Sequence, residues 1–139
     1  MAMTVDECRD RFAPARSLRL ATADGQGRPH LVPATFALTG DTVVIAVDHK
    51  PKRHMNLKRL ANIKENPAVT LLVDHFEEDW EELWWVRADG VARVLENELA
   101  RELVDLLVNK YGQYRERRPG GPVISIQVTR WSGWVAKQE

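Results

Sequence analysis

The sequence contains a single cysteine, Cys8, among 139 residues. Neither an intrachain disulfide nor a zinc cluster built on cysteines can therefore form, and we expect Cys8 to pack in the core. No apolar run approaches the ~18 residues of a membrane-spanning helix, and the N-terminus has no apolar segment that could direct secretion. These absences predict a cytoplasmic protein that has no membrane partner.

Net charge is also absent, because 20 Lys and Arg residues balance 20 Asp and Glu residues. Domains that bind nucleic acid are usually strongly basic, so a pI near 6.9 argues against a nucleic-acid partner. Hydrophobic residues make up 44% of the chain and charged residues 29%, which is an ordinary balance for a folded protein. The length predicts one domain that covers residues 1–139.

One stretch departs from this charge balance. Residues 49–64 read HKPKRHMNLKRLANIK and contain six cations but no acidic residue. Like charges three or four residues apart on a helix repel each other, so a solvated helix face usually mixes the two signs. The stretch therefore favours an anionic partner, and the alternative interpretation is a purely solvated helix face. Its cations are Lys50, Lys52, Arg53, Lys58, Arg59 and Lys64.

Apolar periodicity predicts six strands and three helices. The strands are expected over residues 17–23, 28–38, 42–48, 68–74, 84–96 and 122–135, and the third is apolar enough to be buried on both faces. Helices are expected from Thr4 to before Pro14, within the basic stretch, and over residues 97–111. Glycines at 25 and 27 predict a tight reversal, and Gly90 predicts a bulge or a close approach within the fifth strand.

Strands joined by hairpin signals, with few helices between them, favour a mainly β fold. A parallel sheet would need a helix after nearly every strand, and this chain does not provide one. The pattern therefore predicts a small antiparallel β-barrel with short helices.

Three segments, in this order, resemble the split β-barrel flavoproteins related to pyridoxamine 5'-phosphate oxidase. They read LRLATADGQGRPHLVPATF, KPKRHMNLKRLANIKENPAVTLLVD and WWVRADGVARV. Within that superfamily the chain is most similar to the short branch that depends on the deazaflavin coenzyme F420. The resemblance implies an FMN-binding split barrel, six-stranded, antiparallel and Greek-key-like, that forms a homodimer with each site at the subunit interface.

The resemblance also implies which residues hold the cofactor. A phosphate would lie where the third strand meets the following helix, bound by Arg53 and Asn56 with Lys50 and Lys52 beside them, while Lys58 and Arg59 would point toward the oligoglutamate tail of F420. Residues expected to line the ring or its pocket are Val32, Pro33, Ala34, Thr35, Asp48, Trp80 and Trp84.

The second strand, HLVPATFAL, and the junction, KPKRHMN, depart from the pattern of the FMN-dependent oxidases. The resemblance therefore favours an F420-dependent reductase that transfers a hydride between the deazaflavin and an unknown small unsaturated or carbonyl substrate. Two alternatives stay open, an FMN-dependent oxidoreductase of the oxidase type and a non-catalytic flavin- or haem-binding protein. His30 and His54 are the histidines nearest to the site, His49 and His54 could ligate haem iron, and no residue is assigned as the proton donor.

Overall fold

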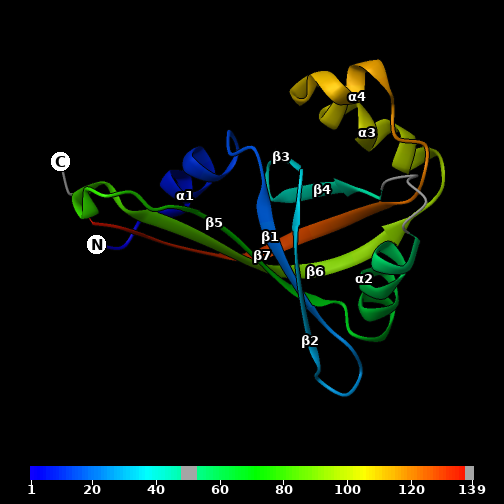
Figure 1. The fold of residues 1–139 in the computed structure, drawn as a ribbon, viewed down its shortest axis with the longest axis horizontal. Helices are drawn as coiled ribbons and strands as arrows, with labels where there is room; N and C mark the ends of the chain where they lie inside the picture. Colours follow the sequence, from blue (N-terminus) through cyan, green and yellow to red (C-terminus); the bar gives the residue numbers. More distant parts are fainter. Residues whose placement is uncertain (48–52, 137–139) are drawn as a thin grey trace.

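The computed structural model describes residues 1–47 and 53–136. For residues 53–57 it describes the backbone alone. Figure 1 shows one curved sheet with helices around it. The strands are β1 Leu18–Ala23, β2 Pro29–Ala34, β3 Ala37–Thr39, β4 Thr42–Ala46, β5 Ala68–His75, β6 Trp84–Leu95 and β7 Val123–Val135. The helices are α1 Val5–Phe12, α2 Arg53–Glu65, the short 3-10 helix η1 Trp80–Glu82, α3 Glu98–Lys110 and α4 Gly112–Glu116.

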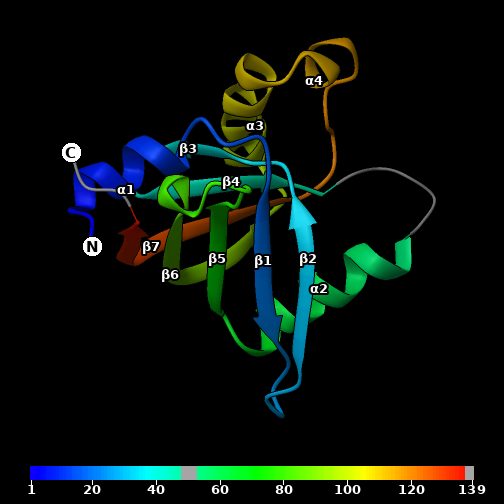
Figure 2. The ribbon, with the colours of Figure 1, turned by 60° about the vertical axis from the view of Figure 1, so that its left-hand side comes forward.

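The sheet is antiparallel throughout, in the order β2-β1-β5-β6-β7-β4-β3. Its two edge strands, β2 and β3, are consecutive in the chain and are separated only by Thr35 and Phe36. Three residue steps span at most about 11 Å. The sheet must therefore curl until its edges approach each other, and in Figure 2 the end of β2 reaches the level of β3 and β4.

The predicted mainly β, antiparallel barrel class is confirmed, but the sheet has seven strands where six were predicted. The extra strand arises because the predicted strand over residues 28–38 divides into β2 and β3. At the division, the backbone N–H of Phe36 donates to the hydroxyl of Tyr111 at 3.2 Å rather than to a neighbouring strand. The Phe36 ring is fully buried, 5.0 Å from the Phe12 ring between centroids.

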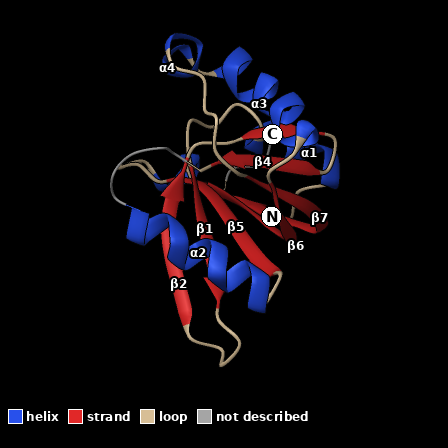
Figure 3. Cartoon of the chain, turned by 90° about the vertical axis from the view of Figure 1, so that its right-hand side faces the viewer, coloured by secondary structure: helices blue, strands red, loops and turns tan. Residues whose placement is uncertain are grey.

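The apolar core has two parts, and β4 contributes to both. Val43 and Ile45 face the interior of the barrel, whereas Val44 faces α3 and packs with Val104 and Leu107. All three β4 residues are at most 1% exposed. The prediction that this strand is buried on both faces is thus confirmed, and Figure 3 shows α3 lying alongside β4.

Helix caps and the bulge also follow the sequence signals. Thr4 and Glu7 form the predicted capping box at the start of α1, and the Asn97 side chain accepts from the Leu99 N–H at the start of α3. The register of β6 and β7 shifts at Asp89 and Gly90. A Cβ atom at Gly90 would lie 2.5 Å from the Gln127 carbonyl oxygen, so the backbones approach too closely for any side chain. Cys8 is 1% exposed, as expected for a core residue.

The β1–β2 reversal is held by the buried carboxylate of Asp24. This carboxylate accepts hydrogen bonds from the Gln26 and Arg28 backbone N–H groups and from Arg28 Nε at 2.7 Å. Hydrogen bonds from the Arg28 side chain and backbone lower the pKa of Asp24 to about 2. Gly27 adopts a φ of 81°, which favours glycine and completes the turn.

We expect the stability of this hairpin to depend on pH through Asp24. Its pKa is depressed from the ordinary 3.8, so the ionised carboxylate stabilises the fold fully above about pH 4, and this contribution disappears as pH falls toward about 2. Asp24→Asn should lower the free energy of unfolding at pH 7, and the difference from wild type should shrink between about pH 4 and pH 2. Urea unfolding of both proteins across this range measures it. A pH-independent difference would contradict the assignment.

Candidate functional site

The most polar interior feature lies where β2 gives way to β3. The Thr35 hydroxyl lies 2.7 Å from the Tyr114 hydroxyl, and the Tyr111 hydroxyl donates to the Arg16 carbonyl at 2.9 Å while accepting from Phe36. The two tyrosine rings pack edge to face with centroids 5.6 Å apart. The segment between β2 and β3 is therefore fixed by the hydroxyls of Tyr111, which lies between α3 and α4, and of Tyr114 on α4.

The four predicted ring-lining residues of this segment differ in exposure. Val32 is buried in the barrel core, Pro33 is exposed, and Ala34 and Thr35 are partly buried. The structure thus places Ala34 and Thr35 at the rim of the barrel, next to Tyr114. Sequence reasoning missed Tyr111 and Tyr114. Two tyrosines three residues apart, directly after α3, are the signal in the sequence that could have pointed to them.

The junction between β4 and α2 carries the predicted phosphate site. Asp48, Lys50 and Lys52 lie outside the described residues, so their predicted roles stay predictions. Arg53 and Asn56 fall in the first turns of α2, which has no acidic residue in its first turn. A helix N-terminus presents unpaired N–H groups and a partial positive charge, so this end of α2 favours an anion.

Within the described part of α2, the two basic residues at 58 and 59 behave differently. Lys58 is exposed, whereas Arg59 is partly buried, and burial lowers its pKa while a charge interaction with Tyr114 opposes that change. The Arg59 side chain therefore packs against the protein near Tyr114. Of the pair expected to reach the oligoglutamate tail, only Lys58 is exposed enough to meet a solvated anion.

The two predicted tryptophans lie at the other end of the sheet. Trp80 is 75% exposed on η1. Trp84 begins β6, stacks on His75 with centroids 6.3 Å apart, and lies beneath the Arg11 guanidinium at 5.3 Å. In Figures 1 and 2 this end of the molecule is remote from α2. One protomer alone therefore does not bring the tryptophans to the N-terminus of α2, so a site shared with the predicted phosphate residues would need a second copy.

The histidines remain without an assigned role. His30 lies on β2 opposite Thr22, whose hydroxyl accepts from the buried Asn62 side chain of α2 at 3.0 Å. Its buried Nδ1 atom has no hydrogen-bond partner among residues 1–47 and 58–136. The side chains of His49 and His54 lie outside the described part of the chain.

The cavities lined by described residues include two of similar size. One, of about 360 Å³, lies between α3 and the sheet and is lined by residues of β4, β6, β7 and α3, including Arg93, Leu99 and Leu103. The other, of about 350 Å³, lies beside the α1–β1 loop and includes Trp84. No helix in the described part of the chain is both long and apolar enough to cross a membrane.

Solved structures share this fold at low sequence identity. A FAD-binding protein from Mycobacterium smegmatis is 20% identical, with a TM-score of 0.67 over 96% of this chain and 97% of that one. A FAD-binding protein from Mesorhizobium loti is also 20% identical, with a TM-score of 0.69 over 96% and 95% of the two chains. A haem storage protein from Vibrio cholerae is 20% identical, with a TM-score of 0.68 over 94% and 91%. No curated protein matches the sequence.

A family model described as pyridoxamine 5'-phosphate oxidase matches residues 4–135. The match begins at Thr4, which caps α1, and ends at Val135, the last residue of β7. It therefore includes the whole sheet and every helix that surrounds it. The chain, over the full extent of its barrel, belongs to the pyridoxamine 5'-phosphate oxidase family.

Proposed function

We propose that this protein is an oxidoreductase that uses coenzyme F420. Hydride would pass between that cofactor and a small unsaturated or carbonyl substrate. The observation that carries the proposal is the basic stretch at residues 49–64, which has no acidic residue and includes α2 from its first residue, Arg53, to Lys64. Such a junction suits the anionic phosphate of a flavin-type cofactor.

The residues near the junction fit such a cofactor. Arg53 and Asn56 would bind the phosphate together with Lys50 and Lys52, and the exposed Lys58 would meet the oligoglutamate tail. The rim formed by Ala34 and Thr35 would support the ring, with Asp48 beside it. The hydroxyls of Thr35 and Tyr114 give this rim polar groups that can orient a ring edge. When bound, F420 supplies a hydride from its ring carbon, and the protein contributes orientation and exclusion of water.

Two alternatives draw on specific relatives. The FAD-binding proteins of Mycobacterium smegmatis and Mesorhizobium loti favour a flavin, and hence FMN as the alternative cofactor. The haem storage protein of Vibrio cholerae favours a non-catalytic haem-binding role on the same barrel. All three relatives share the fold at 20% identity, which does not fix the ligand.

A titration distinguishes these cofactors. We expect F420 to bind more tightly than FMN, because Lys58 and the neighbouring cations can also meet the polyanionic tail. Salt should weaken mainly the tail contribution, since exposed charges are screened over roughly 8–10 Å at 0.1–0.15 M ionic strength. Separate isotherms with F420, FMN and haem at low and moderate salt measure this. Equal, salt-independent affinities for F420 and FMN would argue against F420, and tight haem binding alone would favour the storage role.

Replacing Arg53 tests the phosphate site itself. Arg53→Ala should weaken F420 binding about ten- to a hundredfold, which corresponds to roughly 1.5–3 kcal/mol for a lost charged hydrogen bond in a sheltered site. The thermal midpoint without cofactor should hardly change. Lys58→Ala is the matched control, because it removes an exposed cation from the same helix and should lose less affinity, with the loss fading as salt rises. If Arg53→Ala binds F420 with wild-type affinity, the proposed phosphate site is wrong.

We further propose that the protein is a homodimer whose sites lie between protomers. Several apolar side chains are exposed on the strands, namely Leu31 at 67%, Val91 at 51% and Trp134 at 40%. Burying them against a second copy would stabilise association, and two-fold symmetry is the commonest arrangement of such pairs. It would also give Trp80 and Trp84 a route to the partner's cofactor.

We expect light scattering at micromolar concentration to give the mass of two chains. Leu31→Lys should shift the equilibrium toward the monomer, because a charged side chain would be buried at the interface. Exposed Leu99 on α3 offers a control substitution, Leu99→Lys, at a site on a different element. A wild-type protein that stays monomeric would exclude an interface site.

A further inference from the structure

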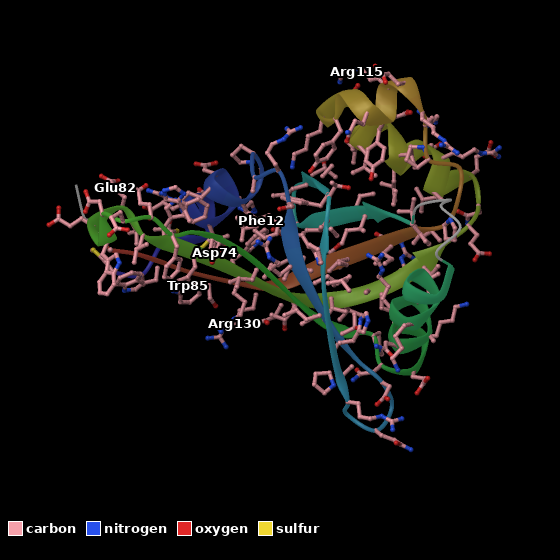
Figure 4. The ribbon with its side chains drawn as sticks, viewed as in Figure 1. Phe12, Asp74, Glu82, Trp85, Arg115 and Arg130 are labelled. Carbon is pink, nitrogen blue, oxygen red and sulfur yellow. The ribbon has the colours of Figure 1, made fainter. Side chains whose placement is uncertain are left out.

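The cavity beside the α1–β1 loop is basic. Its volume is about 350 Å³, which is within the range of small-molecule sites. Three arginines from three consecutive segments line it: Arg11 lies in the last turn of α1, Arg16 lies in the loop, and Arg19 lies on β1. Ser17, Asp74, His75 and Trp84 also line it. In Figure 4, Asp74 of β5 lies on the α1 side of the sheet, away from α2.

The contacts of the three guanidinium groups within the described residues use few of their N–H donors. Arg11 lies 5.3 Å from the Trp84 ring centroid, and Arg16 lies 4.5 Å from the Tyr111 ring centroid while donating one hydrogen bond to the Lys110 carbonyl. Among the described residues, Arg19 donates to the Ser17 hydroxyl at a long distance of 3.5 Å. Stacking on an aromatic ring uses the flat face of a guanidinium and leaves its edge N–H groups available.

Positive charge dominates this cavity. Among residues 1–47 and 58–136, no carboxylate lies within ion-pair distance of Arg11, Arg16 or Arg19. Asp74 is the one acidic side chain in the described lining. Three like charges gathered around one cavity repel each other, so an anion that enters it is bound by all three and relieves this repulsion.

We propose that this cavity binds the phosphate group of a small soluble phosphomonoester. A carboxylate has two oxygens and can be satisfied by one arginine in a bidentate pair, whereas a phosphomonoester has three terminal oxygens that accept from separate directions. Arginines that line the cavity from α1, the following loop and β1 come from separate segments, which suits the second arrangement. Asp74 and Ser17 also line the cavity, and their oxygens are suited to bond to hydroxyl groups of the remainder of the ligand.

The cavity uses none of the residues proposed to hold the cofactor phosphate, although it shares Trp84 with the proposed ring pocket of the partner. The phosphate of F420 would lie at the N-terminus of α2. The arginine-lined cavity is formed by the end of α1, the following loop and the ends of β1 and β5, and α1 lies on the far side of the sheet from α2 (Figures 1 and 2). Trp84 supports Arg11 through one ring face in this site.

The test is calorimetric titration of the full chain, in phosphate-free buffer at low salt, with inorganic phosphate, glycerol 3-phosphate and glycerol. Both phosphates should bind and glycerol should not. Arg19→Ala should weaken phosphate binding roughly three- to tenfold, since a charged hydrogen bond is lost at an exposed position. Arg130→Ala, an exposed arginine on β7 that Figure 4 shows away from α1, is the matched control and should bind like wild type.

A second variant, Asp74→Asn, should change the phosphate affinity in the opposite direction from Arg19→Ala. Removing the one acidic side chain from the described lining should tighten the binding of inorganic phosphate about two- to threefold, because it removes a negative charge that repels the anion. Thermal midpoints without phosphate check that each variant folds. The titration is repeated in Arg53→Ala, where binding should persist. Phosphate affinity that is unchanged in Arg19→Ala, or that falls only in Arg53→Ala, would overturn the proposal.

Discussion

The hydroxyl of Tyr111 connects the segment between β2 and β3 to the loop before β1. One short segment supplies both edges of the sheet, so its backbone must leave one edge and start the other within two residues. Such a break exposes a backbone N–H in the interior, and a buried donor without a partner costs about 1–3 kcal/mol. Tyr111 accepts from the Phe36 N–H and donates to the Arg16 carbonyl. One side chain thereby gives a hydrogen-bond partner to a backbone group between β2 and β3 and to another in the loop before β1.

Lys110 reinforces the same junction from the neighbouring position. Its Nζ atom donates to the Ala13 and Ala15 carbonyls at 3.0 and 2.7 Å and lies 3.7 Å from the Phe36 ring centroid. Burial, and then the nearby charge of Arg16, lower the pKa of Lys110 to about 8. Keeping it charged below that pH has a free-energy cost, which two carbonyl acceptors and an aromatic face partly offset. The end of α3 thereby fixes the loop that carries Arg16 beside the basic cavity.

Local signals could be predicted from the sequence. The Thr4 capping box, the Asn97 cap and the bulge at Gly90 each depend on residues adjacent in the chain or on a strand period. The division of the second strand could not be predicted, because it depends on Tyr111, 75 residues away. The exposure of Lys58 but not Arg59 likewise depends on what packs against α2, and periodicity within a helix does not reveal the position of Tyr114.

The arginine-lined cavity escaped sequence reasoning for a related reason. Arg11, Arg16 and Arg19 have no motif spacing, since one lies on a helix, one in a loop and one on a strand, and only the turn between α1 and β1 gathers them. The basic stretch at residues 49–64 was visible because its cations are contiguous. With a net charge of zero and screening over roughly 8–10 Å, the chain as a whole exerts little long-range attraction on an anion. Anion recognition must therefore be local, and it depends on how the turns and helix ends concentrate cations while placing the balancing acids elsewhere.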